Sequence, residues 1–317
     1  MSDRYFILTT LRSWAKIYDA NVSFPRPCQA LGTDHSNFVV NCSVGWDRYM
    51  EVDPPFFGYY SEGHDKMGPR PECTNQIIFS EETAKEFFNR PRDEVRKSSF
   101  CLDLQKSLYS ATDWLGGVLA KANISFTWNE FRTSPELFPK PSHHVISHAN
   151  KFLHGLGIVN HNYGILKIRR GDYSSIGKMS VCTQIPEVIH TWAALLNSYR
   201  RPNTEIPSAW LVFGDVEPGY WDNFKSNFTQ LAAVPFVNTS QPLKNYVQRF
   251  IVEDDLRYSG KSLKEAFPDN YFLYAIILHL IRSTRFSIGG HGEGNFGNVC
   301  QQCGSRYCSG WRKPRRL

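Results

Sequence analysis

In the second half of the chain, segments with hydrophobic residues at helical spacing alternate with short runs of consecutive hydrophobic residues. Apolar residues at helical spacing predict helices over residues 142–156, 185–199, 218–226, 242–250 and 270–281. Short apolar runs predict buried strands over residues 163–168, 209–213, 231–237 and 285–288. Strands that alternate with helices are typical of a parallel sheet with helices on both faces. We therefore expect residues 142–300 to form one doubly wound α/β domain.

The first half of the chain has a weaker pattern. Residues 1–75 are rich in proline and contain two short strand-like runs, at 5–9 and 38–41. Ser80 is followed by two glutamates, which predicts the N-cap of a helix ending near residue 89. Apolar positions at three- and four-residue steps predict a longer amphipathic helix over 102–122.

The segment 131–141 carries three prolines and little periodicity, so we expect it to connect two domains. The predicted organisation is an N-terminal α/β domain over 1–141, a second domain over 142–300 and a basic, cysteine-containing tail over 301–317. A chain of 317 residues with 41% hydrophobic residues is long enough to build two such cores.

Charge and hydropathy restrict the partners. Residues 1–150 hold 16 Lys and Arg against 18 Asp and Glu, whereas 151–317 hold 20 against 12, so the net charge of +6 comes from the second half. Much of that excess lies in the tail, and no basic face with interleaved aromatic residues suggests nucleic-acid binding. A bilayer-spanning helix needs about 20 apolar residues, and no run of that length predicts a membrane span.

The expected compartment rests on cysteines and glycosylation sequons. The even number of eight cysteines permits four disulfides, as in secreted domains. The Asn-x-Ser/Thr triplets stand at Asn21, Asn41, Asn123, Asn227 and Asn238. No signal-peptide pattern opens the chain. We expect a glycoprotein of the secretory lumen, in the Golgi or endoplasmic reticulum, whose anchor is absent from this chain; a cytoplasmic protein is the alternative.

The chemistry-bearing residues follow two predicted strands. The first strand runs directly into Arg169, Arg170 and Asp172. In open α/β sheets ligands bind beyond the C-terminal ends of the strands, where an arginine can hold phosphate oxygens bidentately. The two arginines lie on opposite faces of the strand, so one of them points into a given cleft. A purely structural ion pair with a carboxylate is the alternative for either one.

The second predicted site follows the strand at 285–288. Five glycines occur in the nine residues from 289 to 297, which permits close backbone approach to a ligand and an anion-binding nest of amides. No Gly-Lys-Ser/Thr follows, so this is not a Walker loop, and an ordinary turn is the alternative.

The run from Tyr163 to Tyr173 resembles the His-x-Arg-Arg-x-Asp region of the α1,2-, α1,6- and protein-O-fucosyltransferase superfamily. The resemblance covers residues 142–300 and implies a GT-B fold, two Rossmann-like domains facing a cleft, with GDP-fucose bound by the second. It implies that Arg169 contacts the β-phosphate and stabilises the leaving GDP, supported by Arg170 and Asp172. The remaining donor-binding residues would be Lys167, Asp215, Gly290, His291, Gly292, Gly294 and Asn295.

This sequence departs from the family pattern in several places. Lys167 stands where the family usually has histidine, the Gly-rich segment replaces a Ser/Thr-rich one, and no Gly-Gly-Leu-Gly-Asn signature is present. The nearest glutamate after Asp172 is Glu187, so the general base stays open. The family is usually metal-independent, and no Asp-x-Asp pair suggests a metal site. The expectation is an inverting fucosyltransferase that needs no metal cofactor and acts on a glycan or protein hydroxyl.

Four other interpretations compete with this one. Arg170-Gly171-Asp172 spells an integrin-binding tripeptide, but it continues a buried strand. Cys300, Cys303, Cys308 and His291 could hold zinc, although disulfides suit a lumenal tail better. His144 and His148 share a helix face at four-residue spacing and could bind a metal as a pair, but a surface or core role is the simpler interpretation. An inactive GT-B-like protein that binds glycan or protein through the cleft is the remaining alternative.

Overall fold

The structure is a computed structural model, and the parts of the chain that it describes are residues 41, 43–51, 75–78, 90–91, 93–94, 100–103, 140–159, 162–170, 183–198, 206–207, 209–234, 241–284 and 286–288. The chain divides into two compact units. One comprises Met1–Ile146 with Asp269–Ala275, and the other comprises Ser147–Pro268 with Ile276–Leu317. The sequence-based boundary at residue 141 stays a prediction.

The described part of the first unit contains a short parallel strand pair. β1 (Asn75–Ile78) pairs with β2 (Phe100–Asp103). The expected helix over 102–122 was wrong at its start, because Leu102 and Asp103 belong to β2. The apolar repeat misplaced that boundary because Leu102 fits a strand of alternating residues as well as a helix. The rest of that helix, the strand at 5–9 and the helix at 80–89 lie outside the described residues.

An aromatic cluster holds the chain around η1, a single 3-10 turn over Trp46–Arg48. Tyr49 and Tyr271 meet edge to face with ring centroids 6.0 Å apart. The Tyr49 hydroxyl donates to Asp269 Oδ2 over 2.7 Å, while Asp269 Oδ1 accepts the backbone N–H groups of Tyr271 and Phe272. Asp269 is thus the N-cap of α11 (Asn270–Ser283). Asn41, which was expected to end a strand, is not in one.

The second unit contains a parallel sheet, as the sequence predicted, and it has four strands. Its strands are β3 (Gly164–Arg169), β4 (Ala209–Asp215), β5 (Arg249–Val252) and β8 (Phe286–Ile288), in the order β5-β4-β3-β8. The chain winds from β3 through β4 to β5 and then returns to the other side of β3 as β8. The order of winding therefore reverses between β3 and β8.

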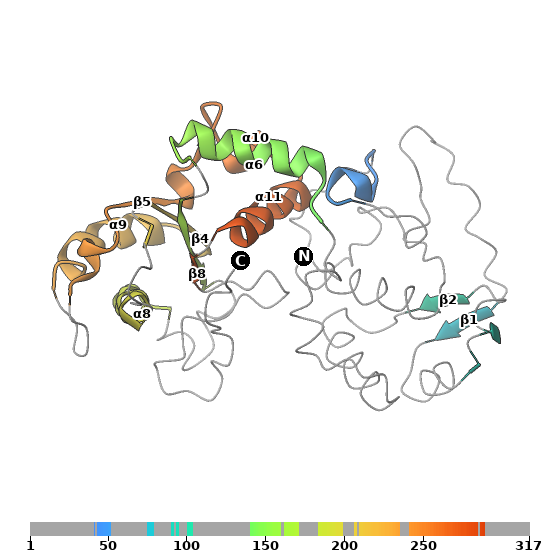
Figure 1. Ribbon diagram of the computed structural model, residues 1–317, viewed down its shortest axis with the longest axis horizontal. Coiled ribbons are helices and arrows are strands. Elements are labelled where there is room, and N and C mark those ends of the chain that lie inside the picture. Colours follow the sequence, from blue (N-terminus) through green and yellow to red (C-terminus); the bar gives the residue numbers. More distant parts are fainter. Residues whose placement is uncertain are drawn as a thin grey trace. The chain divides into compact units, whose positions relative to one another are not determined.

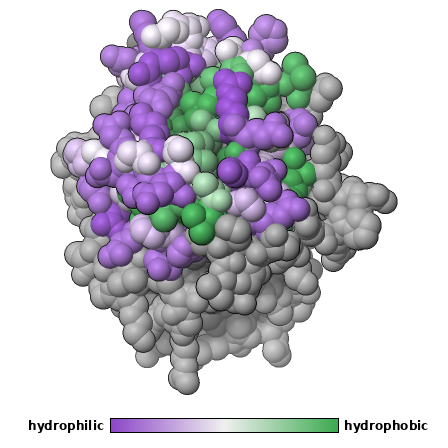
Figure 2. All heavy atoms as spheres, turned by 90° about the vertical axis from the view of Figure 1, so that its left-hand side faces the viewer, coloured by the Kyte–Doolittle hydropathy of each residue, from purple (hydrophilic) through white to green (hydrophobic). Residues whose placement is uncertain are grey.

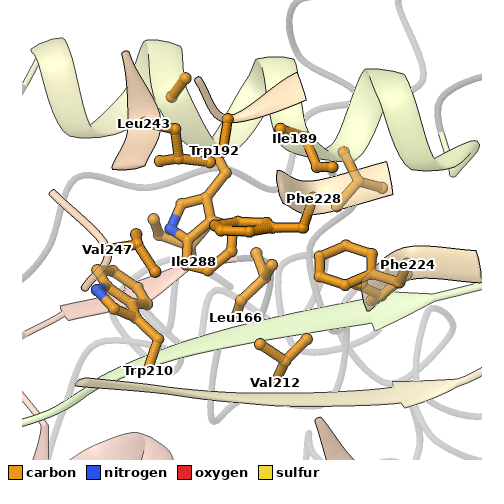
Figure 3. Close-up of a cluster of buried hydrophobic side chains, with 14 of the residues drawn as sticks. Leu166, Ile189, Trp192, Trp210, Val212, Phe224, Phe228, Leu243, Val247 and Ile288 are labelled. Carbon is orange, nitrogen blue, oxygen red and sulfur yellow. The ribbon is translucent and has the colours of Figure 1, made fainter. Parts of the chain in front are cut away.

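Helices cover both faces of this sheet (Figure 1). α8 (Ile185–Ser198) and α9 (Tyr220–Leu231) pack on one face against alternate strand residues, among them Leu166, Val212 and Ile288 (Figure 3). α6 (His143–Gly155) and the C-terminal part of α11 lie on the other side (Figure 1). The buried Tyr163 hydroxyl donates to the Leu280 carbonyl of α11 over 2.8 Å.

Burial agrees with this layering. Within the described residues the large hydrophobic side chains that are clearly exposed are Val159 and Val234. Figure 2 shows a face on which hydrophilic side chains surround a narrow strip of hydrophobic ones. α11 is buried on nearly all sides, as its apolar sequence predicted. The chain is thus α/β with a Rossmann-like parallel sheet in this unit.

Short elements join β5 to α11. They are η4 (Glu253–Asp255), the hairpin of β6 (Arg257–Tyr258) and β7 (Lys261–Ser262), and α10 (Leu263–Ala266). Ser262 and Glu265 form a capping box at the start of α10. His148 on α6 contacts this hairpin, since its Nδ1 lies 2.7 Å from the Tyr258 hydroxyl oxygen.

Two expected elements between α9 and α10 were wrong. The strand predicted at 231–237 is wrong over 231–234, because Leu231 continues the helical spacing of Phe224 and Phe228 in α9 and 232–234 form a turn. Residues 235–237 lie outside the described residues. The predicted helix at 242–250 is one 3-10 turn, η3 (Leu243–Asn245), followed by β5. The apolar run in β5 is short enough for either structure, and pairing with β4 decides it. The helix expected over 218–226 is confirmed, but it continues to Leu231 as α9. The remaining helices and strands expected after residue 141 are confirmed within about two residues at their ends.

Candidate functional site

The candidate site is the edge of the sheet at which the parallel strands end. In open α/β sheets ligands bind beyond this edge, at the point where the order of winding reverses. Here that point lies between β3, which ends at Arg169, and β8, which ends at Ile288. Both segments that the sequence singled out therefore leave neighbouring strands at the same edge.

Strand register places the residues of this edge. Arg169 is the Cα partner of Asp215, and Lys167 is the partner of Phe213. Alternation puts positions 167, 169 and 215 on the strand face that also carries the buried Ile165, away from α8 and α9. Lys167 is half-buried and Asp215 is exposed. A cationic and an anionic position thus meet at the ends of β3 and β4.

The Gly-rich segment begins beside this pair. Ile288 of β8 is the partner of Leu166 in β3, so the chain leaves β8 at the level of Lys167. Residues 289–300 lie outside the described residues, and so does Asp172; the predicted contacts of Gly290, His291, Gly292, Gly294 and Asn295 stay predictions. What the register shows is only that the segment starts one strand away from Arg169.

Arg170 is held by protein groups. Its Nε donates to Glu217 Oε1 and Oε2 over 2.6 and 2.8 Å, and its Nη1 donates to Thr183 Oγ1 over 3.1 Å. Its guanidinium carbon lies 5.6 Å from the centroid of the Tyr220 ring. Arg170 therefore makes the kind of structural ion pair that the sequence left open, with Glu217 as partner.

A second carboxylate holds the neighbouring turn. Glu253 follows β5 and accepts the backbone N–H of Gly214 through Oε2 over 3.0 Å. Burial raises the pKa of this carboxyl above its usual value, although the Gly214 N–H and the charges of Lys264 and Lys167 act in the opposite direction. Burial also raises the pKa of the Tyr220 hydroxyl, which donates to the Thr183 carbonyl.

Gly214 itself is required by close packing. A Cβ at this position would lie 2.8 Å from the Ile168 carbonyl oxygen and 3.1 Å from the Trp221 ring. Any larger residue would push β4 away from β3 at the end where Arg169 and Asp215 are opposite each other in the strand register. The absence of a side chain at 214 keeps the strand ends together.

Sequence reasoning found the strand-end residues but missed their supporting carboxylates. Glu217 and Glu253 each lie two residues or fewer beyond the end of a strand, in Asp215-Val216-Glu217 and Val252-Glu253. That position was the available signal, since acidic residues directly after a parallel strand face the same edge as Arg169. Thr183 carried no comparable signal.

The described residues contain no group of three or more His, Cys, Asp or Glu side chains that could hold a metal ion. Cys300, Cys303, Cys308 and His291 lie outside them. Of the helical histidines, His148 contacts the Tyr258 hydroxyl. Over the same part of the chain, none of the helices has the length and apolar character needed to cross a membrane.

Comparison with known proteins does not identify a relative. No protein-family model, no curated protein and no solved structure matches the chain.

Proposed function

We propose that the protein is a glycosyltransferase of the GT-B type, and specifically an inverting fucosyltransferase that transfers fucose from GDP-fucose to a glycan or protein hydroxyl. The second unit would bind the donor, and the acceptor would enter from the first. The proposal combines the Arg-Arg-Gly-Asp resemblance with the position of those residues in the fold.

One observation carries the proposal. Arg169 ends β3 next to the point where the winding order of the sheet reverses, and the Gly-rich segment leaves β8 on the adjacent side. A diphosphate bound there would meet a guanidinium from one strand and backbone amides from the next, which is a common way to hold phosphate. Because Arg170 is engaged by Glu217 and Thr183, Arg169 is the better candidate for the ligand contact.

The proposed chemistry is a single displacement at the sugar carbon. The acceptor oxygen forms a bond to C1 of fucose while the bond from C1 to the β-phosphate oxygen breaks, and the acceptor proton passes to a general base. Charge develops on the departing GDP, where a fixed arginine stabilises the transition state more than the ground state. Asp215 is a carboxylate at this edge, but its role as a donor contact stays part of the proposal.

The test is a thermal-shift titration without added metal, using GDP, GDP-fucose, UDP and UDP-sugars. A ligand present at 100 times its Kd stabilises the native state by about 2.7 kcal/mol, which is a rise in Tm of roughly 5–10 °C for a unit of this size. We expect GDP and GDP-fucose to produce the shift and the uridine nucleotides to produce none.

Two variants make the assignment specific. Arg169→Ala should weaken GDP binding roughly 10- to 100-fold, the usual loss for a charge-assisted hydrogen bond. Arg249→Ala is the matched control, because Arg249 begins β5 at the opposite edge of the same sheet and is exposed. If GDP raises the Tm of both variants equally, or if no nucleotide raises the Tm of the wild-type chain, the donor site is refuted. An inactive relative that binds glycan or protein would then be favoured.

A further inference from the structure

Arg170 is fixed through both its main chain and its side chain. Its backbone N–H donates to the Asp215 carbonyl over 2.9 Å, which continues the pairing of β3 with β4 one residue beyond Arg169. Its Nε hydrogen is shared between the two oxygens of Glu217. Arg170 therefore ties the end of β3 to the turn between β4 and α9.

The Arg170 guanidinium is mostly buried, whereas its partner Glu217 lies at the surface. The Arg170 side chain is 18% exposed and Glu217 is 45% exposed. Thr183, which accepts from Arg170 Nη1, is 1% exposed, and Tyr220 beneath the guanidinium is 4% exposed. The Tyr220 hydroxyl donates in turn to the Thr183 carbonyl over 3.0 Å. Glu217 places a carboxylate against Nε of this guanidinium, whereas Thr183 and Tyr220 contact it with uncharged groups.

Loss of Glu217 would remove the carboxylate that accepts from Nε of a guanidinium whose side chain is only 18% exposed. A mostly buried charge that loses a hydrogen-bonded carboxylate is less stable in its place and shifts toward water. The residue next to it in the chain is Arg169, so movement of Arg170 would change the backbone from which Arg169 extends. A change of about 1 Å in the position of a binding group is enough to weaken its contact strongly.

We propose that Glu217 is a positioning residue of the donor site, which acts through Arg170 to hold Arg169 in the orientation that binds the diphosphate. This inference rests on the proposed function. It assigns Glu217 no contact with the ligand; its effect on binding passes entirely through the ion pair.

The experiment measures the Kd for GDP by calorimetry in metal-free buffer, together with the Tm, on the full chain. Glu217→Ala should raise the Kd about tenfold, within the range found when an outer partner of a ligand-holding group is lost. Glu217→Asp keeps the carboxylate and should restore part of the affinity. Glu217→Gln keeps an acceptor without the charge, and it serves as the folded alternative if Glu217→Ala does not fold.

Two controls separate positioning from general effects. Asp222→Ala removes a negative charge in the first turn of α9, where the carboxylate is 85% exposed and pairs with Lys225, so the Kd should stay within about twofold. Tyr163→Phe removes the hydroxyl bond to the Leu280 carbonyl beyond the other end of β3 and lowers stability away from the site. It should lower the Tm without changing the Kd.

The outcomes are distinct. A raised Kd in Glu217→Ala or Glu217→Gln, with both controls near wild type, supports the proposal. A Kd within about twofold of wild type in both Glu217 variants, with or without a lower Tm, overturns it and leaves the donor site standing. Failure of the wild-type chain to bind GDP overturns both this inference and the proposed function.

Discussion

Two buried tryptophans offer a stringent test of the packing between α8 and the sheet. Trp192 and Trp210 are both fully buried, and their rings meet edge to face with centroids 5.1 Å apart (Figure 3). The Trp210 Nε1 donates to the Pro207 carbonyl over 2.8 Å, whereas the Trp192 Nε1 has no acceptor among the residues that the structure describes. We therefore predict that Trp210→Phe destabilises the fold more than Trp192→Phe.

The magnitude follows from what each substitution leaves behind. Both variants lose the same atoms from the same core, so the transfer and cavity contributions largely cancel in the comparison. Trp210→Phe also leaves the buried Pro207 carbonyl without its donor, at a cost of about 1–3 kcal/mol. Trp192→Phe removes a buried N–H and leaves no partner unsatisfied. The expected difference in unfolding free energy is thus at least about 1–3 kcal/mol.

The assay is urea unfolding of both variants and wild type followed by far-UV circular dichroism. The midpoint for Trp210→Phe should lie below that for Trp192→Phe at a similar m value, because the two proteins expose the same surface on unfolding. Equal midpoints, or a lower midpoint for Trp192→Phe, would refute the assignment of hydrogen bonds in this core.

Three other predictions concern single positions. Gly164→Ala places a Cβ 2.5 Å from the Trp210 ring and should cost about 1–3 kcal/mol, whereas Gly155→Ala, with nothing within 4 Å, should stabilise α6 by up to about 1 kcal/mol; thermal unfolding compares them. Burial raises the pKa of the Glu253 carboxyl above its ordinary 4.5. The contribution of this carboxyl to stability is therefore full below the pKa of the unfolded chain, and it is lost as the pH rises through the pKa of the folded protein. As the pH rises above 4.5, Glu253→Gln should accordingly lose less stability than wild type, and parallel pH profiles of the two proteins would contradict this. Ser262→Ala removes the capping box of α10 and should cost about 0.5–2 kcal/mol in urea unfolding.

The parallel sheet could be predicted because its strands are buried on both faces. β3, apart from Lys167, and β4 are apolar runs that end in charged residues, and α8 between them has a clear helical period. β5 could not be predicted in the same way: Phe250, Ile251 and Val252 are too few to distinguish a strand from a turn of helix. Its pairing with β4 is a tertiary contact that local sequence does not encode.

The candidate site could be predicted only in part for a similar reason. Arg169 and Asp215 stand at the ends of recognisable strands, so their approach at one edge follows from parallel pairing. The ion pair of Arg170 with Glu217 joins residues 47 positions apart, and it depends on how the turn after β4 folds back over β3. The hydrogen bond from the Gly214 N–H to Glu253 likewise depends on the pairing of β5 with β4, because Glu253 directly follows β5.

The central claim is that a guanine nucleotide binds beyond the ends of β3 and β8. The most direct measurement is an experimental structure of the full chain with GDP, grown without added metal. The account predicts the diphosphate at the C-terminal edge of the sheet, in contact with Arg169 and adjacent to the end of β8. Nucleotide found at another place on the chain, or no binding at millimolar GDP, would contradict it.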